Sequence, residues 1–200
     1  MIIRQIEIGH MDNFCYLVGC EQTRKAVVID PGTDVEMIIA EAEKEGLAIE
    51  AIVNTHGHGD HTAGNAALKA LTGAKIFIHT LDASAVPKAD VLFSGDQELR
   101  VGDIAFKIFH TPGHTPGGIC LYAPGNLFTG DTLFVGDSGR TDLRGGHRPT
   151  LGASIRRLMT LPEDTVVWPG HDYGPTPFST IGWEKRHNVN AKEYGYFVSV

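Results

Sequence analysis

Short apolar runs separated by turn residues recur along the first half of the chain. Ile2 to Ile8 alternates between apolar and polar positions, and similar runs rich in Val and Ile cover Phe14 to Val18, Ala26 to Ile29, Ile49 to Asn54 and Lys75 to Ile78. Runs of this length and composition are typical of β-strands. We therefore predict five strands in this half.

Two stretches between these strands have helical spacing instead. Four apolar residues from Val35 to Ala42 share one face of a helix, with Asp34 placed to cap its start and Gly46 to end it. Thr62 to Leu71 is a second helical pattern. The first half is thus predicted to be a sheet with two helices.

The second half repeats this mixture of strands and helices. We predict strands at Ile104 to Phe109, Gly118 to Tyr122, Leu127 to Thr129 and Thr165 to Trp168, helices at Pro149 to Met159 and Ser179 to Tyr194, and a loop from Val86 to Glu98. Because each half pairs strands with helices, we expect one domain over residues 1–200, with two sheets packed face to face and helices outside.

Composition indicates a chain that folds around its own core. The 200 residues are 42% hydrophobic and 20% charged, enough to bury a core without disulfides or a structural metal. A metal ion would therefore serve chemistry more than folding. Cys15, Cys20 and Cys120 form no metal-binding pattern and are expected to be small buried side chains in a reducing compartment.

Net charge and hydropathy limit the classes of partner that the sequence predicts. The formal charge of -7 disfavours nucleic acid as a partner. The first residues, Met1 to Ile6, lack the apolar segment of a signal peptide, and no run of 18 apolar residues predicts a membrane span. We expect a cytoplasmic protein acting on a small molecule, and composition leaves the oligomeric state open.

The run Thr55-His56-Gly57-His58-Gly59-Asp60-His61 directly follows a predicted strand. Imidazole and carboxylate groups are ligands for zinc and similar divalent ions. On an extended segment His56, His58 and Asp60 point one way and His61 points another, whereas on a tight loop the set divides into two pairs. The glycines allow such a bend.

Three further candidate ligands occur at the ends of predicted strands. They are His114, Asp131 and His171, and each is preceded by glycine. A lone Gly-Asp or Gly-His is more often part of a turn. Together with the first run, these residues predict a metal site assembled from several strand ends.

These motifs resemble those of the metallo-β-lactamase fold superfamily and, within it, the single-domain glyoxalase II-like (hydroxyacylglutathione hydrolase-like) proteins. The matching elements are Thr55 to His61, the turn at His114, Gly130-Asp131-Thr132, Ser138-Gly139-Arg140 and Pro169-Gly170-His171. They extend over about residues 10 to 190. The resemblance implies a four-layer αββα sandwich of two mixed sheets with outer helices.

The resemblance also implies two divalent metal ions, zinc by expectation, with iron or manganese as alternatives. It assigns His56, His58 and His114 to the first ion and Asp60, His61 and His171 to the second, with Asp131 as a bridge between them. All seven residues are present.

The chemistry implied by the resemblance is hydrolysis of a thioester of the S-acyl glutathione kind, by a hydroxide shared between the ions. Asp60, which would orient the hydroxide, and the bridging Asp131 are the expected catalytic residues. Arg140 and Tyr173 match substrate-binding positions of glyoxalase II-like enzymes. Asp142 departs from the aromatic residue of glutathione-specific members, and the chain is shorter than full glyoxalase II.

Other functions stay open. A persulfide dioxygenase on the same fold would use one iron, held here by His56, His114 and Asp131, a ligand set suited to non-haem iron. A β-lactamase is disfavoured because no export signal is present, and a non-catalytic protein because no ligand is missing. Arg144, His147 and Arg148 are either a solvated loop or a site for an anionic substrate tail.

Overall fold

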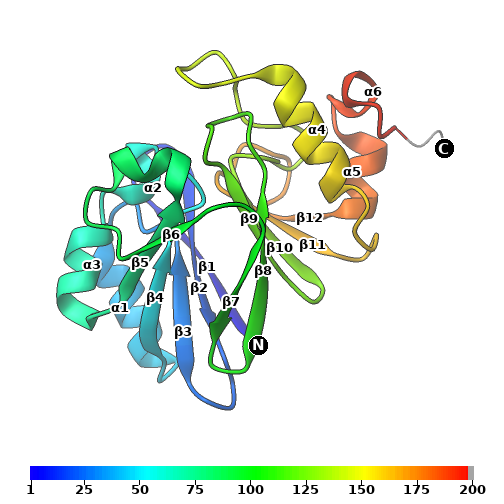
Figure 1. Cartoon of the computed structure of the whole chain (residues 1–200). Coiled ribbons are helices and arrows are strands. Elements are labelled where there is room, and N and C mark those ends of the chain that lie inside the picture. Colours follow the sequence, from blue (N-terminus) through cyan, green and yellow to red (C-terminus); the bar gives the residue numbers. More distant parts are fainter. Residues whose placement is uncertain (198–200) are drawn as a thin grey trace.

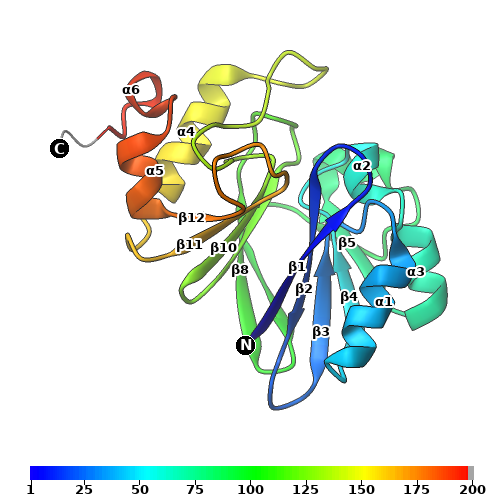
Figure 2. The same cartoon turned by 180° about the vertical axis from the view of Figure 1, so that it is seen from behind.

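The computed structural model describes residues 1–197, whose strands form two six-stranded β-sheets packed face to face (Figures 1 and 2). The first sheet has the order β1-β2-β3-β4-β5-β6. Its strands are β1 (Ile2–Ile8), β2 (Asn13–Gly19), β3 (Lys25–Ile29), β4 (Ala48–Val53), β5 (Lys75–His79) and β6 (Val91–Phe93). The second sheet has the order β12-β11-β10-β9-β8-β7. Its strands are β7 (Gln97–Val101), β8 (Ile104–His110), β9 (Ile119–Ala123), β10 (Asn126–Gly130), β11 (Val166–Pro169) and β12 (Ser179–Thr180).

Both sheets are mixed. In the first, β1, β2 and β3 are antiparallel, and β3 to β6 are parallel. In the second, β10 and β11 are parallel and the other neighbours are antiparallel. Because β9 runs against both β8 and β10, the strands β8, β10 and β11 all run the same way. Their carboxyl ends therefore meet at one edge of the sheet.

Helices cover the outer face of each sheet (Figures 1 and 2). The helices of the described residues are α1 (Val35–Lys44), α2 (Gly59–Thr62), α3 (Asn65–Thr72), the 3-10 helix η1 (Thr80–Ala85), α4 (Arg148–Leu158), α5 (Ile181–His187) and α6 (Ala191–Tyr194). Helices α1 and α3 lie on the first sheet, and α4, α5 and α6 on the second. The four-layer αββα sandwich is therefore confirmed.

Alternation along the strands supplies the core on both sides of a sheet. In β2, Cys15 and Leu17 belong to the cluster beneath α1, whereas Phe14, Tyr16 and Val18 belong to the cluster between the sheets. A third cluster fills the space between the second sheet and α4 to α6. This period of two is why the strand pattern was readable from the sequence.

The cysteines and the helices can be compared directly with what the sequence predicts. The cysteines are free and buried, as predicted. Among residues 1–197, no helix combines the length and apolar character needed to cross a membrane.

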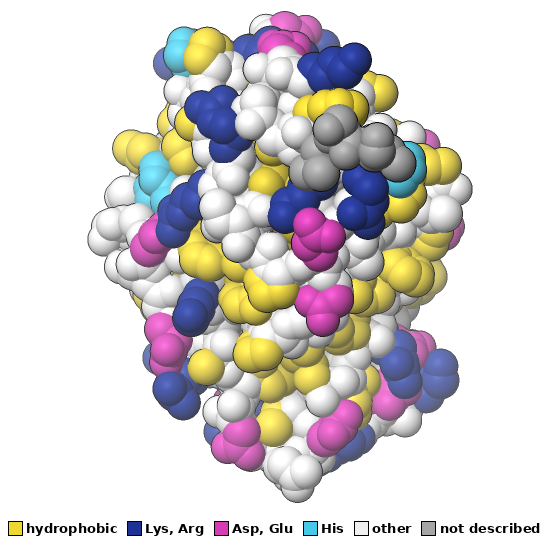
Figure 3. All heavy atoms as spheres, turned by 90° about the vertical axis from the view of Figure 1, so that its right-hand side faces the viewer, with side chains coloured by type: hydrophobic (Ala, Val, Ile, Leu, Met, Phe, Trp, Pro, Cys, Tyr) yellow, Lys and Arg dark blue, Asp and Glu magenta, His cyan; other side chains and the backbone are white. Residues whose placement is uncertain are grey.

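Figure 3 looks onto the face that carries α4 to α6, where basic and acidic side chains are interspersed. Two of the basic side chains of α4, those of Arg148 and Arg157, are paired with Glu193 and Asp96.

The prediction of a loop from Val86 to Glu98 was wrong. This segment contains β6 and the beginning of β7. Strand β6 has three residues and is held by pairing with β5, and β7 is held by a hairpin with β8. Strands this short lack a readable alternation, and their partners are supplied by the sheet.

The helix predicted from Thr62 to Leu71 is divided into α2 and α3. The break falls at Gly64, whose N–H donates to the carbonyl of Pro31 at 2.9 Å. A Cβ at Gly64 would lie 2.5 Å from that oxygen, so the chain approaches too closely for a larger residue. The consequence is a separate one-turn helix, α2, that carries Asp60 and His61.

The predictions for two other helices also need correction. Ser179 to Tyr194 contains β12, α5 and α6, because Ser179 and Thr180 pair with β11 and the helix ends at His187. The side chain of Asp34 does not cap α1. Its Oδ2 instead accepts the N–H of Gly9 at 2.7 Å.

Candidate metal centre

The seven predicted ligands lie together at the carboxyl ends of four strands. They come from the loop after β4 (His56, His58), from α2 (Asp60, His61), from the β8–β9 loop (His114), and from the residues that follow β10 (Asp131) and β11 (His171). Strand β4 belongs to the first sheet and the other three to the second. The site therefore lies at the seam between the two sheets.

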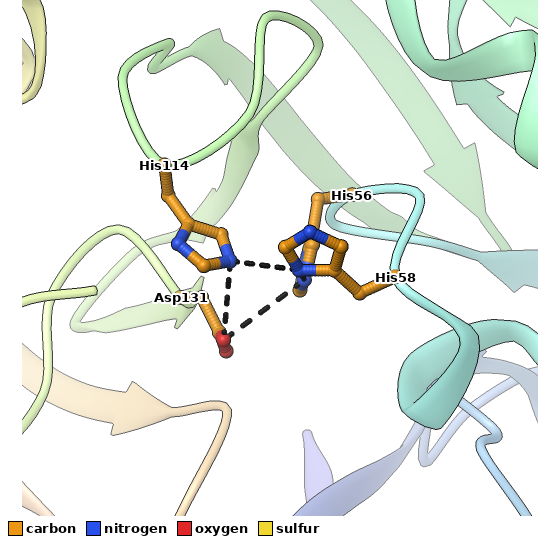
Figure 4. Close-up of side chains that lie close together, drawn as sticks. All are labelled: His56, His58, His114 and Asp131. Carbon is orange, nitrogen blue, oxygen red and sulfur yellow. Dashed lines mark hydrogen bonds and ion pairs between the residues drawn. The ribbon is translucent and has the colours of Figure 1, made fainter. Parts of the chain in front are cut away.

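The first cluster contains His56, His58, His114 and Asp131, and Figure 4 shows these side chains pointing toward one another. Nδ1 of His58 lies 3.0 Å from Nε2 of His56 and 2.9 Å from Nε2 of His114. Ring nitrogens that share one zinc ion at about 2.0–2.1 Å in a tetrahedron lie about 3.3 Å apart. The observed spacing is close to this value.

The second cluster contains Asp60, His61 and His171. Nε2 of His61 lies 3.1 Å from Nε2 of His171, and Oδ2 of Asp60 lies 3.4 Å and 3.6 Å from these two nitrogens. The side chains of the first run are therefore divided into two pairs, which is the arrangement that a tight loop allows. The pair His56 and His58 faces His114, and the pair Asp60 and His61 faces His171.

Asp131 lies between the clusters. Its Oδ1 is 3.4 Å from Nε2 of His61, and its Oδ2 is 3.4 Å from Nε2 of both His114 and His171. The residue is 8% exposed, and its Oδ1 is buried with no hydrogen-bond partner. A buried carboxylate oxygen without a donor is costly, and a cation at this point would remove the cost. The residues therefore fit a pair of divalent ions with Asp131 as the shared ligand.

The outer ring nitrogens of three histidines are held by oxygen atoms. Nδ1 of His114 donates to the carbonyl of Arg140 at 2.7 Å, and Nδ1 of His171 donates to the carbonyl of Met11 at 2.8 Å. Nδ1 of His61 lies 3.1 Å from Oδ2 of Asp30. A histidine that donates on one side presents the lone pair of its other nitrogen on the opposite side, as metal ligands do.

Asp30 is a buried residue of the site that the sequence analysis missed. Its Oδ1 accepts the N–H of Thr55 at 2.7 Å, and its Oδ2 accepts the Thr55 hydroxyl at 2.6 Å as well as His61. That hydroxyl lies 3.1 Å from Nδ1 of His56. Because its oxygens are occupied by these donors, we assign Asp30 to orienting His56 and His61 rather than to binding an ion.

Burial and charge act in opposite directions on the histidines. Burial lowers the pKa of His56 and His58, and nearby histidines add to this effect, so both favour the neutral form that binds metals. Burial also opposes a charge on His61, but Asp131, Asp30 and other carboxylates outweigh it and raise its pKa to about 9. The carboxylates around His61 therefore favour a positive charge at this position.

Five of the seven candidate ligands line a cleft of about 480 Å³, and they are His58, Asp60, His114, Asp131 and His171. Arg140 and Tyr173, the two predicted substrate contacts, both line it, together with Phe134. The ring of Tyr173 stacks on His171, with centroids 4.5 Å apart, and meets Phe134 edge-on. The walls near the second cluster are therefore aromatic.

Two of the three arginines considered for substrate binding, Arg140 and Arg148, are paired with carboxylates in the structure. Nε and Nη2 of Arg140 donate to the two oxygens of Asp142 at 2.7 Å and 2.6 Å. Arg148 makes the same kind of bidentate contact with Glu193. An anionic substrate that used Arg140 would have to compete with Asp142.

Comparison with known proteins agrees with this arrangement. A family model described as the metallo-beta-lactamase superfamily matches residues 8–171. The chain belongs to this superfamily. Two hydroxyacylglutathione hydrolases, from Nitrosococcus oceani and Chromohalobacter salexigens, are 38% and 41% identical to it over 178 and 165 residues. These matches cover 86% and 81% of this chain but 67% and 63% of the relatives, so the chain spans about two thirds of their length.

Solved structures of the superfamily are also similar to the chain. ETHE1 from Myxococcus xanthus has a TM-score of 0.91 and 36% identity, and the match covers 99% of this chain and 88% of that one. The protein TTHA1623, solved in a di-iron-bound form, has a TM-score of 0.79 and 33% identity, with 93% and 98% covered. The resemblance inferred from the motifs is therefore confirmed.

Proposed function

We propose that this chain is a metal-dependent hydrolase that binds two divalent ions and cleaves a thioester of the S-acyl glutathione kind. The observation that carries the proposal is the convergence of seven ligand side chains on two clusters that share Asp131. The similarity to hydroxyacylglutathione hydrolases supports the substrate class, and the similarity to a di-iron protein supports two ions.

In this proposal, His56, His58 and His114 hold one ion, Asp60, His61 and His171 hold the other, and Asp131 contacts both. When bound, the ions would supply a Lewis acid for the carbonyl oxygen and would lower the pKa of water, so that hydroxide is available to attack at neutral pH. Zinc is the expected metal, and iron or manganese suits the same donor types.

Asp60 is the residue that we propose orients the attacking water. It lines the cleft, and its Oδ2 is held in place by Nδ2 of Asn13 at 2.9 Å. The thiolate leaving group needs little assistance from the side chains. A thiol has a pKa of about 8.5, so a thiolate leaves without a proton donor nearby. Orientation of the water and the carbonyl is then the main task of the side chains.

We propose that the cleft wall contacts the rest of the substrate. Phe134 and Tyr173 offer an apolar surface beside the second cluster. Arg140, in the same segment between β10 and α4 as Phe134, offers a guanidinium for a carboxylate of the thiol portion once Asp142 is displaced. We therefore propose Tyr173 and Arg140 as substrate-binding residues.

The alternative function is a persulfide dioxygenase with one iron held by His56, His114 and Asp131. The similarity to ETHE1 favours it. Both functions would use the first cluster, in which Nδ1 of His58 lies within 3.0 Å of the Nε2 atoms of His56 and His114. The retention of His58 favours neither function, and two assays distinguish them.

Two assays on the same purified protein test the proposal. We expect zinc-loaded protein to hydrolyse S-D-lactoylglutathione, followed as loss of thioester absorbance, and iron-loaded protein to consume no oxygen when given glutathione persulfide. Oxygen uptake with no hydrolysis would contradict the hydrolase assignment.

A pair of histidine variants shows whether turnover depends on the site. His114→Ala should abolish hydrolysis. His187→Ala removes an exposed imidazole that stacks on Trp183 of α5, away from the clusters, and should leave the rate unchanged. Equal activity of the two variants would place the reaction elsewhere.

A further inference from the structure

A buried carboxylate outside the ligand set, Asp82 of η1, makes all its hydrogen bonds to loops that carry ligands. Its side chain is buried, and its Oδ2 accepts the N–H of Gly57 at 3.0 Å and the hydroxyl of Thr115 at 2.6 Å. Its Oδ1 accepts the N–H of Gly117 at 2.8 Å. Gly57 lies between His56 and His58, and Thr115 follows His114.

The backbone packs tightly against this carboxylate. A Cβ at Gly117 would lie 2.6 Å from Cγ of Asp82, and a Cβ at Gly57 would lie 3.3 Å from Cβ of Asp82. Both loops therefore need glycine to reach the carboxylate. This close approach makes their separation sensitive to the group that stands between them.

The contacts of Asp82 cross the boundary between the two sheets. Helix η1 connects β5 and β6 of the first sheet, whereas Thr115 and Gly117 belong to the β8–β9 loop of the second. Beside it, His79 at the end of β5 stacks on His110 at the end of β8, with centroids 4.1 Å apart and planes 9° apart. The stacked rings join the strands, and Asp82 joins the loops beyond them.

We propose that Asp82 is a positioning residue that sets the separation between His56 and His58 on one sheet and His114 on the other. Without its carboxylate, three donors in the two loops lose their shared acceptor, and the loops are free to move apart. The inference rests on the proposed metal sites and not on the reaction, because both candidate reactions need His56 and His114 on one ion.

Asp82→Asn tests the inference with almost no change of volume. Its amide can accept from fewer of the three donors and presents an N–H group to the rest. We expect zinc affinity at the first cluster to fall about 10- to 100-fold, the range for groups that orient metal ligands. Affinity is measured by competition with a chromophoric chelator, in the His171→Ala background, where the remaining zinc reports the first cluster.

Two variants control for a general effect on folding. Asp90→Asn makes the same chemical change beyond η1, where Asp90 accepts the N–H of Ile76 and pairs with Lys69, and should leave zinc affinity unchanged. Thr115→Ser keeps the hydroxyl and should also bind zinc normally, whereas Thr115→Val should weaken it. Circular dichroism of the metal-free proteins confirms that each is folded.

Folded Asp82→Asn protein with unaltered zinc affinity would overturn the inference, as would an equal loss in Asp90→Asn. The proposed function fails separately, if wild-type protein binds zinc but hydrolyses no thioester. If wild-type protein binds a single ion, the comparison of Asp82→Asn with Asp90→Asn is made on that ion, with the same expected loss.

Discussion

Gly130 is the residue that allows Asp131 to reach both clusters. It has a φ of +47°, and a Cβ there would lie 2.2 Å from Oγ1 of Thr55. We expect Gly130→Ala to lower the free energy of unfolding by about 1–2 kcal/mol, because alanine is strained at this φ. Overpacking of the new Cβ against Thr55 should lower it further, by about 1–3 kcal/mol. The free energy of unfolding of the metal-free protein in urea measures this.

Gly125→Ala is the matched control. Gly125 has a φ of +80°, and no atom lies within 4 Å of the position of its Cβ. Gly125→Ala should therefore lower the free energy of unfolding only by the contribution from backbone strain. Equal destabilisation of the two variants would show that the contact between Gly130 and Thr55 has no role.

The pair Arg140–Asp142 leads to a prediction about substrate charge. The Arg140 guanidinium holds the pKa of Asp142 at about 2, so the carboxylate is ionised at neutral pH and occupies Arg140. Asp142→Asn should free Arg140 and lower KM for S-D-lactoylglutathione about two- to fivefold, the modest range of an exposed ion pair. Steady-state kinetics with this substrate and with an uncharged thioester of N-acetylcysteamine measure the effect.

Glu50→Gln is the control for Asp142→Asn. Glu50 forms a similarly exposed pair with Lys25 at the amino-terminal end of β4, and the substitution removes the same charge. It should leave both KM values unchanged. A lower KM for the uncharged thioester in Asp142→Asn would mean that Arg140 does not select for charge.

Single residues also mark the limit of prediction at the site. His56, His58 and Asp60 stand in one run, and a run can be recognised. Asp30 follows a strand inside Asp-Pro-Gly, where it resembles a turn residue, and its φ of 55° is not readable from its neighbours. Asp82 lies in a segment without any motif. Both act through partners 25 or more residues away, which sequence order does not reveal.

At the scale of elements, α5 is tied to its surroundings by the buried carboxylate of Glu184. It accepts from Oγ of Ser179 on β12, from Nδ2 of Asn188, and from the N–H of Gly136 at 3.1 Å. Burial raises the pKa of Glu184 above its ordinary value, although these donors oppose the shift. The folded protein therefore holds this proton more tightly than the unfolded chain, where the pKa is about 4.3.

The sign of the resulting pH dependence follows directly. The contribution of Glu184 to stability is largest below pH 4.3, and it falls as pH rises from about 4.3 through the raised folded pKa. The difference in unfolding free energy between wild type and Glu184→Gln should therefore decrease across this window and then level off. Glu43→Gln, an exposed change on α1, should show no such decrease. A difference that grew with pH would contradict the raised pKa.

Elements with a strong period were predictable, and those defined by their partners were not. The alternation in β1 and β2 and the apolar face of α1 were visible in the sequence because each buries one face in a large cluster. Strand β6, with three residues, exists because β5 offers an unpaired edge. Glycine at position 64 divides α2 from α3 through a contact with Pro31 that no local pattern indicates.

For the whole molecule, the two halves predicted from the sequence correspond to the two sheets. The sequence also placed each ligand at a strand end, but it did not give the order of the strands. The parallel direction of β8, β10 and β11 brings His114, Asp131 and His171 to one edge. Strand β4 lies across the seam between the sheets, and the residues that follow it add the ligands of the first run. The metal centre is thus a property of how the two sheets meet.

The number of metal ions bound per chain tests this account most directly. Wild-type, His171→Ala and Asp131→Ala proteins are loaded with zinc, dialysed against the same limiting chelator, and weighed by native mass spectrometry. We predict two ions in the wild type, one in His171→Ala, and weakened binding of both in Asp131→Ala. His171→Ala protein that kept two ions and full thioester hydrolysis would contradict the dinuclear centre.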